Sequence, residues 1–248
     1  MKKIAIAVLL LFISIHLFAQ QPADSAVNMS NNPQPADFGN TLSKYSLAFE
    51  LTTNWLSPLP TGVTNDYIGG LGLAVDVQRK IFIIKKNFYF SFGLGIATYD
   101  YATNAQINYA STNPAAPSQT DYSFFQKISD SVNYSKNKLN LVWLQVPLEF
   151  HLKSNPNAQG KFVDFEFGGR FGLLINNHTK QKGTAPNGDI YKVKIYEIKN
   201  LNPIATMLTA KIGYDHANLF GYYNLLTLFK TNNGAATNEL GAGISMTF

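Results

Sequence analysis

The chain has 248 residues, of which 46% are hydrophobic, 13% aromatic and only 14% charged, whereas an ordinary soluble domain carries about 25% charged residues. The absence of cysteine excludes disulfides, thiolate metal sites, a cysteine nucleophile and a lipidated N-terminal cysteine. The 18 phenylalanines argue against wholesale disorder. The formal net charge of +5, which falls to +3 without Lys2 and Lys3, is too mild to indicate nucleic-acid binding.

The start of the chain predicts an export signal followed by a lead-in. Lys2 and Lys3 precede a short apolar stretch that ends at Ala19, which is the pattern of a secretory signal peptide over residues 1–19. A membrane anchor would need about 20 apolar residues, more than this stretch holds. Residues 20–43 are poor in large apolar side chains and rich in proline and asparagine, which predicts a disordered periplasmic lead-in.

From residue 44 onward, large apolar side chains alternate with small or polar ones, and this period of two predicts β-strands. Most of the alternating segments are long enough for a tilted strand to cross a bilayer, which takes about 9–11 residues. Eight strands are expected, at residues 45–52, 71–78, 88–97, 142–152, 164–175, 204–215, 218–230 and 240–248.

The composition of the two strand faces decides between a soluble and a membrane fold. In a soluble sandwich or lipocalin, the large apolar residues face an interior core and charges cover the outside. Here the second face holds mostly Gly, Ser, Ala and Thr, as at Gly93 and Gly95, and small residues suit the interior of a narrow barrel. Open strand edges are not tolerated in lipid. Residues 44–248 therefore predict an all-β fold, a closed antiparallel eight-stranded transmembrane up-and-down β-barrel.

The connections support this prediction, because long outer loops and short periplasmic turns are typical of outer-membrane barrels. The expected outer loops are residues 55–67, 102–137, 177–202 and 230–237, and the expected turns are residues 81–87, 153–161 and 215–218. Within the outer loops, residues 123–128 are apolar enough to pack on another element. Residues 190–199 alternate apolar and mostly basic side chains, which predicts a hairpin that extends beyond the membrane.

Aromatic residues near the strand ends predict two belts at the membrane surfaces. The outer belt is expected to contain Trp55, Tyr99, Tyr101 and Trp143, and the inner belt Phe88, Phe162, Tyr214 and Phe248. Pro147 interrupts a strand that otherwise alternates regularly. Because proline cannot donate a ladder hydrogen bond, we expect a bulge or a local weakness in pairing there.

Eight ionisable residues fall on the expected inner face. They are Glu50, Asp76, Glu149, His151, Asp164, Glu166, Arg170 and Lys211. A lone charge in a narrow, low-dielectric interior is costly, so these groups are expected to pair. The favoured interpretation is a structural network that fills the interior, and the alternative is a proton or ion path or a catalytic site. A general porin is not expected, since eight strands enclose a space just wide enough for side chains.

Two segments resemble a known family. The sequence Leu144-Gln145-Val146-Pro147-Leu148-Glu149-Phe150 resembles the "L-x-[IV]-P-L" strand of the PorT-like outer-membrane β-barrels, and residues 167–175 resemble the glycine-rich strand that follows it. Phe248, after alternating apolar residues, resembles the signal that barrels present to the barrel-insertion machinery. The resemblance covers residues 44–248 and implies a location in the cell outer membrane. The chain departs from the two-domain OmpA-type arrangement, so no peptidoglycan-binding domain is expected.

The sequence favours a non-enzymatic barrel with a structural or surface-interaction role. The resemblance implies an alternative, an accessory component of a secretion or envelope-assembly complex. A surface lipid-modifying enzyme is a further alternative, with His178 in the third outer loop as its candidate base. No catalytic residue, cofactor or metal site is predicted, because the chain has no phosphate-binding glycine loop, no H-E-x-x-H and no G-x-S-x-G.

Expected partners follow from the predicted location. They are outer-membrane lipid and lipopolysaccharide, the barrel-insertion machinery and an unidentified envelope protein, with no nucleic acid. Lys192, Lys194 and Lys199 could meet lipopolysaccharide phosphates in a non-specific electrostatic contact, although a solvated face is the simpler interpretation of these residues.

Overall fold

The computed structural model describes residues 44–84, 87–113, 116–185 and 187–248. The predicted signal peptide and the predicted lead-in lie outside the described residues. Within these ranges all regular secondary structure is β-strand, and no helix is long and apolar enough to cross a membrane.

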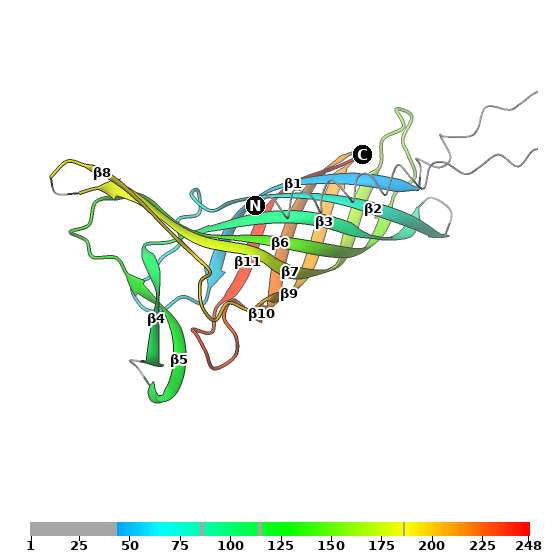
Figure 1. Ribbon diagram of the computed structural model, residues 1–248. Helices are drawn as coiled ribbons and strands as arrows, with labels where there is room; N and C mark the ends of the chain where they lie inside the picture. Colours follow the sequence, from blue (N-terminus) through cyan, green and yellow to red (C-terminus); the bar gives the residue numbers. More distant parts are fainter. Residues whose placement is uncertain (1–43, 85–86, 114–115, 186) are drawn as a thin grey trace, which may run out of the picture. The chain divides into compact units, whose positions relative to one another are not determined.

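Eight long strands close into an antiparallel barrel (Figure 1). They are β1 (Tyr45–Ser57), β2 (Leu71–Ile84), β3 (Phe88–Ala102), β6 (Tyr134–Lys153), β7 (Val163–Thr184), β9 (Ile204–Tyr214), β10 (Ala217–Thr227) and β11 (Asn238–Thr247). Each barrel strand pairs with the barrel strands before and after it along the chain, and β1 pairs with β11 to close the sheet. This confirms the predicted eight-stranded up-and-down β-barrel.

The connections at the two ends of the barrel differ in length. Three short connections join β2 to β3, β6 to β7 and β9 to β10 at one end, which we call the short-turn end. Longer connections join β1 to β2, β3 to β6, β7 to β9 and β10 to β11 at the other end, which we call the long-loop end. The predicted asymmetry of the connections is therefore confirmed.

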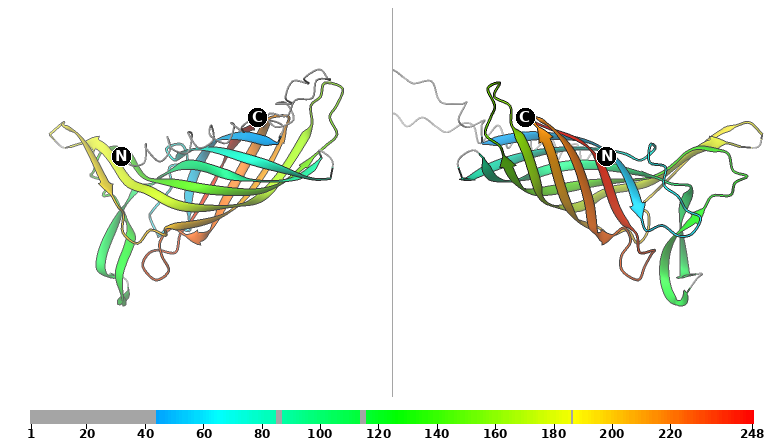
Figure 2. Two further views of the ribbon diagram at one scale, coloured as in Figure 1. Left: turned by 45° about the vertical axis from the view of Figure 1, so that its right-hand side comes forward. Right: turned by 180° about the vertical axis from the view of Figure 1, so that it is seen from behind.

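Strands β4 (Ala105–Asn113), β5 (Ala116–Lys127) and β8 (Ile190–Tyr196) lie at the long-loop end, where Figure 2 shows them in green and yellow. Strand β8 pairs with the last part of β7, which confirms the predicted hairpin. Strands β4 and β5 form a separate hairpin inside the connection from β3 to β6. Both strands lie within the predicted outer loop at residues 102–137, because their mostly small and polar residues lack the apolar alternation of the barrel strands.

Side chains alternate between the interior and the outer surface on every barrel strand. The outward positions carry large apolar residues that are well exposed, such as Leu73 at 57% and Phe171 at 51%. Exposed apolar residues of this kind occur on all eight strands and form a continuous surface far larger than an ordinary soluble monomer presents. The large apolar side chains therefore face outward, as predicted.

The predicted outer aromatic belt is wrong for three of its four members. Tyr99, Tyr101 and Trp143 are 0%, 1% and 2% exposed and lie in the interior. The reason is the period of two: Phe92, Leu94 and Ile96 face outward on β3, so the odd-numbered tyrosines of that strand face inward. Trp55 does face outward, half-buried against Tyr67, with ring centroids 6.0 Å apart.

The predicted inner belt is placed mostly as expected, with one exception. Tyr214 and Phe248 are exposed at the short-turn end, and Phe88 lies on the outward side of β3, where its ring stacks on Phe150. Phe162 precedes β7 by one residue and instead lies over the barrel mouth, where the Lys153 ammonium sits 4.2 Å from its ring centroid.

Pro147 has the local effect that its chemistry predicts. Pairing between β3 and β6 lapses after Phe92 and Leu148 and resumes at Gly95 and Gln145 in the same register. The missing N–H therefore weakens the ladder without inserting a bulge.

Candidate functional site

The barrel interior holds a group of buried charges, which we call the interior ion cluster. Each side chain in it belongs to a residue that is at most 3% exposed. The interior ion cluster consists of Glu50, Asp76, Glu149, His151, Glu166, Arg170 and Lys211. The structure thus brings together all the predicted interior charges except Asp164.

Arg170 on β7 is the centre of the cluster. Its guanidinium donates two hydrogen bonds to Glu50 on β1, of 2.5 and 2.6 Å, and one of 3.1 Å to Glu149 on β6. Asp76 on β2 lies 3.9 Å away, and the Phe220 ring packs 4.8 Å from the guanidinium carbon. A bidentate arginine–carboxylate pair is the strongest ion-pair geometry that side chains offer.

Lys211 on β9 supplies the second permanent cation. Its Nζ lies 3.1 Å from Glu149, 3.1 Å from Glu166 and 3.3 Å from Glu50. Three carboxylates therefore share one ammonium, and two of them also accept hydrogen bonds from Arg170. Each of the two permanent cations therefore contacts carboxylates from more than one strand across the width of the barrel, which offsets part of the cost of burying these charges.

Neutral side chains complete the network. Gln145 donates to Asp76 at 2.7 Å, Gln78 donates to Glu149 at 2.9 Å, and Ser91 donates to Gln78 at 2.8 Å. Gly95 leaves room for the Asp76 carboxylate, because a Cβ atom there would lie 1.7 Å from its Oδ1. Gln78, Ser91 and Gln145 occupy the same inward-facing alternate positions as the charged residues of their strands. This shared position in the alternation was the sequence signal that could have assigned them to the network.

Asp164 stands apart from the cluster, close to the short-turn end. It pairs at 3.4 Å with Lys153, which is not among the predicted interior charges. Lys153 sits partly exposed at the barrel mouth, where its ammonium also lies 5.4 Å from the Tyr89 ring centroid. This pair forms the boundary between the buried network and solvent.

Three cluster residues have the spacing of a metal site. One ligand atom each from Glu149, His151 and Glu166 lies within 4.8 Å of the others. However, the Lys211 ammonium lies 3.1 Å from oxygens of both carboxylates. The chain therefore provides its own cation at the place that a metal ion would take.

Ser91, His151 and Glu166 have the connectivity of a serine–histidine–carboxylate triad. Ser91 Oγ lies 2.8 Å from His151 Nε2, and His151 Nδ1 lies 3.4 Å from Glu166. Ser91 is fully buried. A cleft of about 290 Å³ opens nearby, lined by residues that include Lys80, Tyr89 and Phe162 but neither Ser91 nor His151. Tyr89 stacks on the His151 ring at 4.2 Å.

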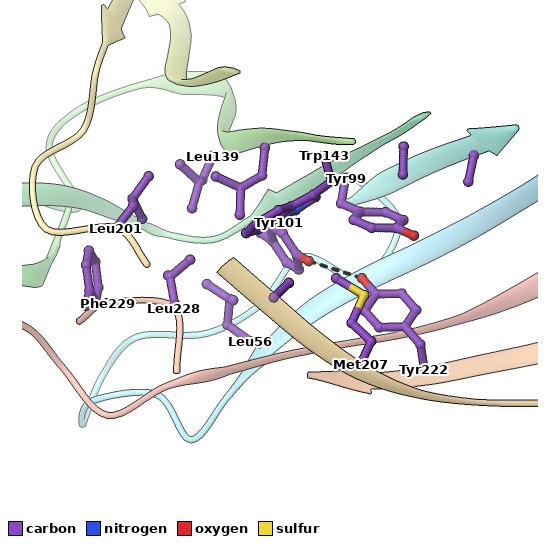
Figure 3. Packing of buried hydrophobic residues seen from close by; sticks show 14 of the residues in the cluster. Leu56, Tyr99, Tyr101, Leu139, Trp143, Leu201, Met207, Tyr222, Leu228 and Phe229 are labelled. Atoms are coloured by element: carbon purple, nitrogen blue, oxygen red, sulfur yellow. Dashed lines mark hydrogen bonds between the residues drawn. The ribbon is translucent and has the colours of Figure 1, made fainter. Parts of the chain in front are cut away.

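A layer of buried aromatic side chains, with Tyr99, Tyr101, Trp143 and Tyr222 among them, fills the interior toward the long-loop end (Figure 3). The Tyr101 and Tyr222 hydroxyls are 3.1 Å apart, and Tyr222 donates to Asn54 at 2.9 Å. The Tyr99 ring stacks on Tyr222, with centroids 5.0 Å apart. Tyr99 and Tyr101, which were predicted for the outer belt, therefore stack or hydrogen-bond with Tyr222 inside the barrel.

The long loops close the barrel above this layer with a hydrophobic cluster of their own. Phe125 from β5 packs on Phe229 from the connection between β10 and β11, with ring centroids 5.7 Å apart. Leu56, Leu139 and Leu201 are buried around them (Figure 3). This confirms that the apolar segment at residues 123–128 packs on another element.

Hydrogen bonds to backbone carbonyls also connect the β4–β5 hairpin to the other loops. The Ser123 amide donates to the Asn233 carbonyl at 2.9 Å, and the Asn200 side chain donates to the Asp121 carbonyl at 2.7 Å. The loops therefore form a connected cap and not a set of independent segments.

Comparison with known proteins gives one informative match. A family model described as "Outer membrane protein beta-barrel domain" matches residues 39–230. No curated protein matches the chain. A solved structure described as "Asymmetric conductivity of engineered proteins" is 13% identical, covers 82% of this chain and 99% of its own, and has a TM-score of 0.21. The E1M, A116K mutant of Rh. blastica porin is 9% identical over the same shares, with a TM-score of 0.20. TM-scores this low do not establish a shared fold.

The family match spans most of the chain and coincides with the barrel strands from β1 to β10. It agrees with the closed sheet and with the apolar surface that surrounds it. The chain therefore belongs to the outer membrane protein β-barrel family and is located in the outer membrane.

Proposed function

We propose that this protein is a non-enzymatic outer-membrane barrel whose interior is filled by side chains, with a structural or surface-interaction role. One observation carries the proposal: the lumen is occupied along its length. The interior ion cluster, the tyrosine layer and the hydrophobic loop cap follow one another from the short-turn end to the long-loop end. This agrees with the general rule that eight strands enclose only enough space for side chains.

A filled interior is expected to prevent ion conduction. The full-length protein, reconstituted into planar lipid bilayers, should show no sustained single-channel openings, because ions would have to displace the paired charges around Arg170. A general porin reconstituted in parallel is the positive control, and a shift of the heat-treated band in gel electrophoresis shows that the barrel is folded. Regular openings of uniform amplitude would overturn the proposal.

The triad geometry at Ser91 provides a second test. A fluorophosphonate probe labels serine hydrolases at an activated, accessible serine. We expect no labelling of the folded protein, because Ser91 is buried and its hydroxyl hydrogen-bonds to Gln78. Ser91→Ala is the matched control for any background signal. Labelling that disappears in Ser91→Ala would make the protein an enzyme and would refute this part of the proposal.

The narrower likeness to the PorT-like barrels supports a second candidate role, as an accessory component of a secretion or envelope-assembly complex. Its two motifs lie side by side in β6 and β7, with Val146 opposite Phe171 and Leu148 opposite Gly169. They contribute Glu149 and Arg170 to the ion cluster. The loop cap offers a folded surface for a partner. Cross-linking in intact envelopes tests this role, which requires a specific cross-linked protein.

Two further partners follow from the location in the outer membrane. The apolar barrel surface is proposed to contact membrane lipid directly. Phe248 is proposed to be part of the signal for the barrel-insertion machinery. Its backbone exchanges hydrogen bonds of 2.9 and 3.0 Å with Leu47, and its ring contacts Phe49 and His216, so the end of β11 is held in register with β1.

A further inference from the structure

Six lysines lie on one face of the small sheet that β6, β7 and β8 form beyond the barrel. We call this set the lysine face; it consists of Lys136, Lys138, Lys180, Lys182, Lys192 and Lys194. Strand pairing arranges them in two rows of three. In the first row Lys180 is opposite both Lys138 and Lys194, and in the second row Lys182 is opposite both Lys136 and Lys192. Directly opposed residues share a face of a sheet.

The lysine face continues the outer surface of the barrel. Leu144 and Val142 point outward on β6, and Asn140 follows on the same side of the strand. Asn140 is opposite His178, which is opposite Tyr196. The surface therefore changes from apolar residues to one polar row and then to the two lysine rows. The lysines lie on the side that faces the surrounding membrane, immediately beyond its apolar part.

The positive charge of this face is almost uncompensated. In the ranges that the structure describes, only Lys138 of the six makes an ion pair, with Asp100 of β3. Like charges directly opposite each other destabilise a sheet, so the arrangement is costly without an external anion. The pKa of the neighbouring His178 is lowered by its partial burial and by the positive charge of Lys194.

We propose that the lysine face binds the phosphate groups of the outer-leaflet lipid, lipopolysaccharide, that surrounds the barrel. Two lysine rows along the strands are about 7 Å apart, and lysines within a row are about 5 Å apart. Several ammonium groups can thus contact one phosphate or two neighbouring ones. The position next to the apolar surface favours a lipid-borne phosphate over a soluble anion. This inference rests on the proposed role as a lipid-embedded barrel with a surface-interaction function.

Two full-length variants with the same change in net charge test the inference. K136Q/K182Q/K192Q/K194Q removes four exposed lysines from the face, and K127Q/K161Q/K199Q/K230Q removes four exposed lysines from elsewhere. All eight side chains are solvent-exposed, so both variants should fold, as the shift of the heat-treated band will show. Native mass spectrometry in mild detergent measures the affinity for added lipopolysaccharide with phosphorylated lipid A.

The affinity of the face variant for lipopolysaccharide is expected to fall roughly tenfold or more, since each lysine near an anionic lipid surface contributes about 1 kcal/mol. The affinity of the control variant for lipopolysaccharide should stay within about twofold of that of the unmodified protein. Equal affinity in the two variants would overturn the inference, as would undiminished binding of lipid A that lacks phosphate.

Inorganic pyrophosphate distinguishes the lipid from a soluble source of phosphate. If it displaces lipopolysaccharide at an equal concentration of phosphate, the face is a soluble-anion site and the inference is wrong. Failure of any of these binding tests in a correctly folded, non-conducting barrel affects this inference alone. Channel openings or serine labelling would instead affect the proposed function.

Discussion

Replacement of Arg170 by methionine is expected to lower the free energy of unfolding by about 3–5 kcal/mol, the usual cost of removing one partner from a buried ion pair. Methionine retains most of the side-chain volume and its packing on Phe220. It leaves Glu50 without its bidentate partner and removes a donor from Glu149. Lys211 is then the one permanent cation of the cluster, with contacts to three of its four carboxyl groups. The measurement is equilibrium unfolding in guanidinium from lipid vesicles.

Two companion variants separate the loss of charge from the loss of shape. Arg170→Lys keeps the charge but not the bidentate geometry, and we expect it to be intermediate in stability. Combining Arg170→Met with Glu50→Gln removes both members of the pair and should recover part of the loss. If Arg170→Met does not assemble, the comparison of Arg170→Lys with the unmodified protein remains. A change below about 0.5 kcal/mol in both single variants, as for a surface residue, would contradict the network's structural role.

Replacement of Trp143 by alanine is expected to lower the free energy of unfolding by a similar amount, about 3–5 kcal/mol, because it leaves a large cavity in a packed interior. The indole lies in the buried cluster with Leu141 and Met207. Gly172 on the adjacent strand makes room for it, since a Cβ atom there would lie 3.1 Å from the ring. Trp55→Ala is the matched control. Trp55 faces outward, so its loss leaves no interior cavity and should cost less.

Fluorescence gives an independent test of the same assignment, because the chain contains only two tryptophans. In Trp55→Phe the remaining Trp143 should emit at short wavelength and escape quenching by brominated lipid tails. In Trp143→Phe the remaining Trp55 should be quenched by the same lipids. Equal quenching of both would return Trp143 to an aromatic belt and would refute the interior packing described above.

The strand pattern could be derived from the sequence because it is local. A side chain faces inward or outward according to its position in the alternation, and this period is visible within a single segment. The same rule could have placed Tyr99 and Tyr101 correctly, since they continue the odd-numbered inward positions of β3. The belt prediction failed because it relied on residue type near a strand end and ignored whether each position is odd or even along the strand.

The ion cluster was predictable in its members and unpredictable in its pairs. The alternation of side chains along each strand placed the charges in the interior, and the narrow interior of an eight-stranded barrel implied that they would pair. Glu50 and Arg170 are separated by 120 positions in the chain and lie on strands that are not neighbours in the sheet. Their contact exists only because the sheet closes, which brings opposite walls of the barrel within reach of two side chains.

The sequence by itself therefore determined the eight barrel strands, the orientation of their two faces and the charged residues that line the interior, because these depend on a period of two within each segment. Only the tertiary structure decided which charges meet, how the loops close the long-loop end, and that lysines from three strands align in two rows. Those features depend on strand register and barrel closure, and hydrogen bonds between distant segments set both.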